Sequence, residues 1–233
     1  MKVCLLCVVL VVSGCASQKS LDDKTAELDA YRKTCQGDLA AVRSKASADL
    51  DAMKSESSKE LQACRNDSDV ATRQLESMKV MEGQLRDRLQ NEIGAKDVEI
   101  ERLRSKLSVH VLDSILFRTG SAEILPGGLV VLDKVAQVIK EGKETIRVEG
   151  HTDDVPIGPE LKKKYFSNWE LSGARASSVV RYFQFHHDID PTRMEAVGFS
   201  KYRPASTHES NLDRKRNRRV EIVLTPWTPE IRN

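Results

Sequence analysis

The sequence predicts an α+β protein in which a long helical segment precedes a mixed-sheet domain. Composition changes near residue 108, because all seven prolines lie beyond it and Tyr31 alone among the aromatic residues precedes it. Apolar residues recur with a period of about seven before this point, and with strand and helix periods in turn after it. We therefore expect an α-helical, coiled-coil segment over residues 15–108, a β-α-β-α-β-(α)-β domain over residues 109–225 and a tail at 226–233.

A short apolar run at residues 3–12 opens the chain and leads into Val12-Ser13-Gly14-Cys15. One positive residue, a short apolar core and a small-residue end are typical of a secretory signal, and the run is shorter than the about 20 residues of a membrane span. Val-Ser-Gly-Cys resembles the lipobox of bacterial lipoproteins. The alternative is an ordinary signal peptide or a short anchor with a chance cysteine. The resemblance implies that residues 1–14 are removed and that Cys15 is lipidated, and Ala16 suggests outer-membrane sorting.

Apolar residues recur every seven positions at Leu21, Leu28, Cys35 and Val42. Two clearer lines of heptad positions follow further along the helical segment. One consists of Leu61, Ser68, Leu75, Glu82 and Leu89, and the other of Cys64, Ala71, Met78 and Leu85. After a stutter of four residues the stripe continues through Ile93, Ile100 and Leu107. A segment with few large apolar groups cannot form a hydrophobic core by itself. Its apolar stripe can be buried by packing against the stripe of a partner helix. We expect a helix that can form a homodimer, with a single solvated, partly disordered tether as the alternative.

Two cysteines, Cys35 and Cys64, lie on the apolar lines of their heptads. In an oxidising periplasm a parallel dimer could join each thiol to its twin. Buried thiols that act as small hydrophobic side chains are an equally good interpretation. The two cysteines are far apart in sequence and no histidine lies in this half of the chain, so we expect no metal site there.

Strand and helix periods alternate in residues 109–225. The expected strands cover residues 109–112, 115–117, 145–149, 194–199 and 220–224, and the expected helices cover residues 126–141 and 167 to about 185. Pro126 suits a first helical turn, and Gly142 ends the same helix. Ser167 and Glu170 form a capping box, which begins the second helix. The last strand alternates apolar and polar residues, as a half-buried strand does.

An arginine, Arg175, lies in the apolar stripe of the second helix, four residues from both Leu171 and Val179. A buried guanidinium is costly unless it is paired or reaches a ligand. Asp153 follows the end of a strand, where binding residues often lie, and is the partner we expect. An arginine and an aspartate held close together can bind the carboxylate and the ammonium of one ligand. A plain Asp153–Arg175 salt bridge is the alternative.

Three sequence blocks carry a resemblance to a known family. They are Gly150-His151-Thr152-Asp153, Asn168-Trp169-Glu170-Leu171-Ser172-Gly173-Ala174-Arg175-Ala176 and Asn217-Arg218-Arg219-Val220-Glu221-Ile222. In this order they resemble the OmpA-like C-terminal domain, the peptidoglycan-binding module of outer-membrane protein A, of peptidoglycan-associated lipoproteins and of the flagellar stator protein MotB. The resemblance covers residues 109–225.

The resemblance implies roles for individual residues. Asp153 and Arg175 would grip the free amino-acid end of meso-diaminopimelate in the peptidoglycan stem peptide, and Asn168 would add a polar contact. Thr152 and the residue after Phe117 would act through their main chains. This last residue is often aspartate in the family and is Arg118 here, so no side-chain role carries over.

Other classes of function fit the sequence poorly. His151 could be drawn with Asp153 and Asp154 as a metal or acid–base cluster, but a second histidine at helical spacing is missing, and no nucleophile elbow, Cys/His pair or HExxH motif occurs. We therefore expect no enzyme, no cofactor and no metal. The basic runs at 162–164 and 214–219 are typical of solvated faces, since the net charge is only +2, so we expect no nucleic-acid partner.

These observations predict an outer-membrane lipoprotein, anchored to lipid through Cys15 and facing the periplasm, that binds peptidoglycan non-covalently and tethers the membrane to the wall. The alternative is a MotB-like stator or motor-associated component, because residues 167–172 and 179–182 look closer to MotB than to outer-membrane protein A. A stator needs a transmembrane helix with a proton-binding aspartate, and the apolar run at residues 3–12 is too short for one.

Overall fold

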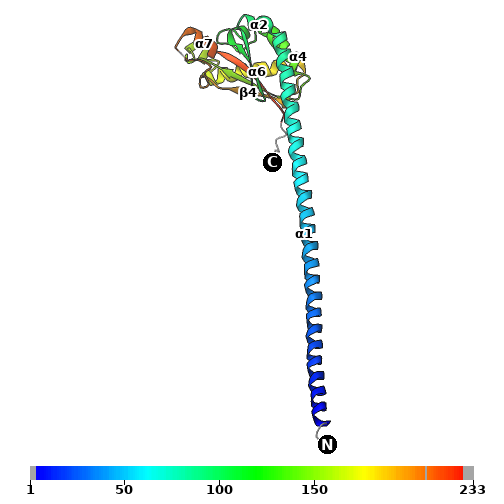
Figure 1. Ribbon diagram of the computed structural model, residues 1–233. Helices are drawn as coiled ribbons and strands as arrows, with labels where there is room; N and C mark the ends of the chain where they lie inside the picture. The colour runs from blue at the N-terminus through cyan, green and yellow to red at the C-terminus, as the bar shows by residue number, and fades with distance from the viewer. Residues whose placement is uncertain (1–3, 208, 228–233) are drawn as a thin grey trace. The chain divides into compact units, whose positions relative to one another are not determined.

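The computed structural model describes residues 4–207 and 209–227, with side chains described from Lys19 onward. The chain forms two compact units that divide between Ser68 and Asp69. Helix α1 (Cys4–Arg88) begins in the first unit and ends in the second (Figure 1). The expected lipidation at Cys15 and residues 228–233 of the expected tail lie outside what is described.

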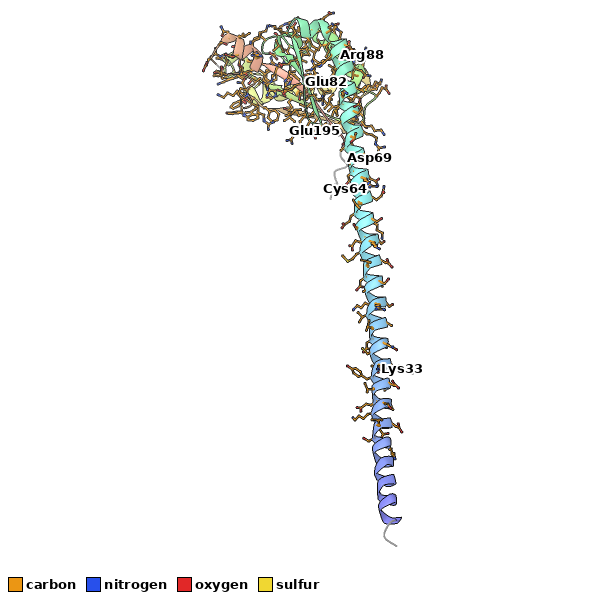
Figure 2. All side chains as sticks on the ribbon, viewed as in Figure 1. Lys33, Cys64, Asp69, Glu82, Arg88 and Glu195 are labelled. Carbon is orange, nitrogen blue, oxygen red and sulfur yellow. The ribbon has the colours of Figure 1, made fainter. Side chains whose placement is uncertain are left out.

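The described residues of the first unit, 4–68, all belong to helix α1. Three apolar heptad residues, Leu21, Leu28 and Leu61, are each more than half exposed, and side chains project from all sides of the helix in Figure 2. Cys35 and Cys64 carry free, exposed thiols. The predicted long helix is confirmed, while its pairing with a second copy stays a prediction. Among the residues described, no helix is both long and apolar enough to span a membrane.

The last part of α1 packs on the domain of the second unit. Its contribution to the hydrophobic core consists of Met78, Met81 and Leu85, with Leu89 directly after the helix. Glu82, labelled in Figure 2, accepts a 2.6 Å hydrogen bond from Arg102 Nε on the sheet. The expectation that the heptad residues Met78, Leu85 and Leu89 face a second helix is therefore wrong, because the chain's own domain covers them.

The helical segment also ends earlier than expected, at Arg88 instead of residue 108. A short helix α2 (Gln90–Gly94) follows, and then β1 (Val98–Leu103) and β2 (Lys106–Leu112) form an antiparallel hairpin. Ile100 and Leu107 are spaced as in a heptad, but both are buried strand residues. The physical reason is local, because alternating apolar residues flank both positions and favour strands over a helix.

Five strands form one mixed sheet in the order β1-β2-β5-β3-β4. Strand β3 (Thr145–His151) is antiparallel to β5 (Arg219–Thr225) and parallel to β4 (Met194–Gly198). Successive side chains of a strand point to opposite faces, so Val148 and Ile222 enter the core while Glu149 and Glu221 point the other way. The predicted α+β fold with a mixed sheet is confirmed.

Two longer helices, α4 (Pro126–Ile139) and α6 (Asn168–His187), are labelled in Figure 1. Both contribute buried residues to the same core as the sheet. Helix α6 begins at the predicted capping box of Ser167 and Glu170. It lies very close to the end of β3, since a Cβ atom at Gly150 would lie only 2.1 Å from Ser172 O. This close packing fixes the first turns of α6 against the loop that follows β3.

The connecting segments contain four shorter elements: α3 (Asp113–Leu116), α5 (Pro159–Lys162), the 3-10 helix η1 (Pro191–Arg193) and α7 (Asn211–Asn217). We expected a strand at residues 115–117, but α3 occupies most of it and Phe117 forms only an isolated bridge with Ile124. The turn of α3 matters for the site, because it brings the Asp113 side chain to helix α6.

Candidate functional site

Arg175 lies on α6 and is buried, as its position in the apolar stripe predicts. Its Nη1 atom lies 2.8 Å from Asp113 Oδ1, and its Nε donates a 2.9 Å hydrogen bond to Ser121 O. The guanidinium carbon lies 5.3 Å from the centre of the Phe117 ring. Burial lowers the pKa of Arg175, and the charge of Asp113 opposes this. A carboxylate, a carbonyl and an aromatic face therefore compensate the buried charge.

Asp153 lies just beyond the end of β3 and is also buried. Its Oδ2 atom lies 2.5 Å from Nη1 of Arg218, which caps the C-terminal end of α7. Its Oδ1 accepts a 3.2 Å hydrogen bond from the backbone N–H of Val155. The Asp153 carboxylate is thus bound by the Arg218 guanidinium on one side and by a backbone N–H of its own loop on the other.

The expected direct pair between Asp153 and Arg175 is therefore replaced by two pairs, Arg175–Asp113 and Asp153–Arg218. The four side chains still act on one another, because Arg175, Arg218 and Asp153 all affect the pKa of Asp113. Burial raises that pKa to about 6, while the two arginines pull it down. Two positive and two negative charges thus form one compact cluster, and we call these four residues the charge cluster.

The other expected binding residues surround the same loop. Asn168 Nδ2 donates to Val155 O at 3.0 Å and to Asp153 O at 3.5 Å. Thr152 is buried, and its backbone N–H donates a 2.9 Å hydrogen bond to Ser200 O. In this structure both residues hold the backbone of the loop that carries Asp153.

Phe117 and Arg118 differ from each other in environment. Phe117 is buried under the Arg175 guanidinium. The side chain of Arg118 is exposed, and its carbonyl oxygen accepts a 2.9 Å hydrogen bond from Ser121 N, in the segment that also binds Arg175. The structure thus brings five of the expected residues around one loop and helix end, and gives Arg118 a main-chain contact.

The segment that carries this geometry matches a family model. The OmpA family model matches residues 116–218, which include Phe117, Asp153, Arg175 and Arg218. Residues 116–218 form an OmpA family domain.

Known proteins resemble the chain beyond this segment. It is 30% identical to the probable lipoprotein YiaD of Escherichia coli over 64% of this chain and 63% of that protein. The structure resembles a putative MotB-like protein from Desulfovibrio vulgaris with a TM-score of 0.62 and 26% identity, covering 70% of this chain and 99% of that one. It also resembles the cell wall anchor of the type VI secretion system (T6SS) from Pseudomonas aeruginosa, with a TM-score of 0.56, 33% identity and coverage of 60% and 96%. The chain spans between 45% and 63% of the length of the curated relatives that match it first.

Two members of the charge cluster, Asp113 and Arg218, were not predicted from the sequence. Asp113 lies before the matched segment, in a stretch expected to join two strands, and Arg218 lies in a basic run interpreted as a solvated face. A signal for Asp113 was present, since a buried arginine requires a carboxylate or a ligand and Asp113 lies in the apolar surroundings of residues 109–117. No such signal points to Arg218, because the direction of its side chain depends on α7 and on the turn after this helix.

The domain also holds a second polar cluster, on the sheet face opposite α4 and α6. His151 Nε2 lies 3.8 Å from Glu149 Oε2 and 3.8 Å from Glu221 Oε1, and all three residues are buried. Their donor atoms lie within 4.8 Å of one another and are of the types that hold metal ions. The sequence places His151 next to Asp153 and Asp154, but strand pairing brings its ring to two glutamates instead. Burial, together with Arg219, lowers the pKa of His151 to about 4, so the ring is neutral at neutral pH.

Proposed function

We propose that the OmpA family domain binds peptidoglycan non-covalently, through the free amino-acid end of diaminopimelate in the stem peptide. The observation that carries this proposal is the charge cluster of Asp113, Asp153, Arg175 and Arg218. A ligand that carries a carboxylate and an ammonium on one carbon matches its two kinds of charge. The carboxylate would take a fork of hydrogen bonds from Arg175, and the ammonium would pair with Asp153.

The balance of charge in the cluster supports a zwitterionic ligand over an ion of either sign. The two arginines and two aspartates sum to zero, so a ligand with no net charge can exchange partners without leaving a buried charge uncompensated. A simple anion or a simple cation would leave one buried charge uncompensated. The expected additional contacts from Asn168, Thr152, Phe117 and the main chain of Arg118 are part of this proposal, because all of these residues border the same loop or guanidinium.

We further propose that the chain is a lipoprotein of the outer membrane, lipidated at Cys15 and facing the periplasm, and that it tethers this membrane to the wall without catalytic turnover. The lipobox-like Val-Ser-Gly-Cys supports the anchor, and so does the similarity to a probable lipoprotein. The similarity to a cell wall anchor supports the tethering role. The proposed domains are a signal peptide at residues 1–14, the anchored helical segment from residue 15, and the wall-binding domain that follows it.

A MotB-like function in the flagellar motor is the second candidate. It is favoured by the similarity to a putative MotB-like protein, of which this chain covers 99%. Both candidates require the same wall contact, and they differ in what the other end of the chain holds. Loss of motility on gene deletion, with an intact envelope, would favour the motor component.

The wall contact is tested by co-sedimentation of the protein with purified peptidoglycan sacculi. Asp153→Asn keeps the shape of the side chain and removes its charge, so binding should fall roughly 10- to 150-fold, as expected for loss of one charge-assisted contact of about 1.5–3 kcal/mol. Arg118→Ala is the matched control and should bind as the wild type does, because only the main chain of Arg118 lies at the site. Free meso-diaminopimelate should compete for binding, and cadaverine, which carries two amines on the same five-carbon chain but no carboxylate, should not.

Binding of Asp153→Asn at wild-type affinity would show that the charge cluster is only structural. Arg175→Lys provides a second test, since it keeps the charge and removes the planar fork. It should weaken binding while the protein stays folded by circular dichroism.

A further inference from the structure

Strands β3 and β5 place two glutamates directly opposite each other on the face away from α4 and α6. Glu149 is the register partner of Glu221, and His151 follows Glu149 on the same side of β3. All three side chains are buried. Like charges that face each other on neighbouring strands destabilise a sheet, and burial makes their repulsion stronger.

Arg219 offsets only part of this negative charge. Its Nε and Nη2 atoms lie 2.7 Å and 2.5 Å from the same oxygen, Glu221 Oε1. Among the ion pairs of the described residues, Glu149 has only the contact with His151 at 3.8 Å. Lys106, Arg203 and Arg147 also act on Glu149 through their charges, but none of them forms an ion pair with it among the described residues.

His151 is the second observation that points to a ligand. Both of its ring nitrogens are buried, and neither has a hydrogen-bond partner among the described residues. Native proteins almost always satisfy such atoms, and an exception calls for a bound water or ion. The ring cannot readily turn away, because it stacks on Phe199 with 5.4 Å between ring centroids and a tilt of 24°.

The distances suit a transition metal. Ligands about 2.0–2.2 Å from zinc at tetrahedral angles lie roughly 3.4 Å from one another. His151 Nε2 lies 3.8 Å from each of the two glutamate oxygens, so small side-chain rotations would close the triangle. A fourth donor is near, since His110 Nδ1 on β2 lies 3.3 Å from Glu221 Oε1. A donor set with histidine nitrogen favours zinc over magnesium or calcium, which prefer oxygen ligands alone.

We propose that Glu149, His151 and Glu221 bind a divalent transition metal, best matched by Zn²⁺, which joins β3 to β5. This site is separate from the wall-binding site and does not depend on it. The two sites are nevertheless adjacent in the chain, because His151 directly precedes Thr152 and Asp153. A metal at this position would stiffen the end of β3 from which the wall-binding loop leaves.

The proposal is tested by titrating Zn²⁺ into the full chain by calorimetry after treatment with a chelator. The protein should carry Cys4→Ser, Cys7→Ser, Cys15→Ser, Cys35→Ser and Cys64→Ser throughout, because thiols outside the site could also bind zinc. One Zn²⁺ per chain should bind and raise the melting temperature. Glu149→Gln, which keeps the shape of the side chain, should weaken binding by at least roughly ten-fold, as loss of a partner at a metal site does.

The matched control is Glu195→Gln on β4, whose partner is the exposed Arg147 and which should leave zinc affinity unchanged. His151→Gln should also lose binding, but a poorly folded variant would not decide the matter, so Glu149→Gln is the deciding change. Absence of zinc binding in the wild type, or wild-type affinity in Glu149→Gln, would overturn the proposal. Loss of binding in His187→Ala would instead place the ion near Asp133 and would also overturn it.

Discussion

At the scale of single residues, Asp113 determines how Arg175 is held before any ligand arrives. Burial raises the pKa of Asp113 to about 6 from its ordinary value of 3.8, despite the pull of Arg175 and Arg218. The folded protein therefore binds a proton at Asp113 more tightly than the unfolded chain does. The contribution of this group to stability is present at low pH and is lost as pH rises from about 4 through about 6.

The direction of this pH dependence gives a prediction for Asp113→Asn, whose side chain cannot ionise. Measured by urea unfolding at pH 4.5, 5.5, 6.5 and 7.5, the stability of the wild type relative to this variant should fall as pH rises. The total change should be at most about 3 kcal/mol, the value of a shift of roughly two pKa units. Other groups cancel in the difference between the two proteins. A difference that stays constant over this range would contradict the raised pKa of Asp113.

At the scale of elements, the sequence predicted best where the local chemistry leaves few alternatives. Ser167 and Glu170 form the predicted capping box of α6, and Pro126 begins α4 as expected. The hairpin of β1 and β2 was not predicted, because Ile100 and Leu107 also satisfy a heptad, although the alternating apolar residues around them favour strands. Similarly, the residue types at the candidate site were predictable, but the partners of Arg175 and Asp153 depend on where α3 and α7 turn.

Helix α1 contains two kinds of heptad residue, which tertiary structure separates. Met78 and Leu85 are covered by the domain, whereas Leu21, Leu28 and Val42 are exposed. Exposed apolar residues at regular heptad spacing are typical of a surface that a partner covers. We therefore keep the prediction of a parallel homodimer for the first unit.

Oxidation of the full chain at low concentration tests this prediction. Cys64 lies on the seam and should form a disulfide with its twin, giving a dimer on non-reducing gels that dithiothreitol abolishes. The matched control moves the thiol to the far side of the helix, with Cys35→Ser and Cys64→Ser combined with Asn66→Cys, and should cross-link poorly. Equal cross-linking from both positions would show random collision and not a paired helix. A wild type that stays monomeric in sedimentation experiments would contradict the dimer directly.

At the scale of the whole molecule, tethering requires that one end of the chain is attached to the wall and the other to a membrane. Binding of the wall by the OmpA family domain restrains the envelope only if the other end is fixed in a membrane. Two or three acyl chains on one cysteine suffice for stable anchoring, whereas a single chain gives only marginal binding. The proposed function therefore depends on Cys15 as much as on Asp153 and Arg175.

Metabolic labelling with palmitate tests the anchor in cells. The wild type should incorporate label and fractionate with membranes, and Cys15→Ser should lose the label and appear in the soluble fraction. Cys35→Ser is the matched control and should keep the label, because its thiol lies in the helical segment and not in the lipobox-like motif. Purified Cys15→Ser protein should still bind sacculi, since the charge cluster lies in a separate part of the chain. Label retained in Cys15→Ser would refute lipidation at this residue, and loss of sacculi binding would show that the wall contact needs the anchor.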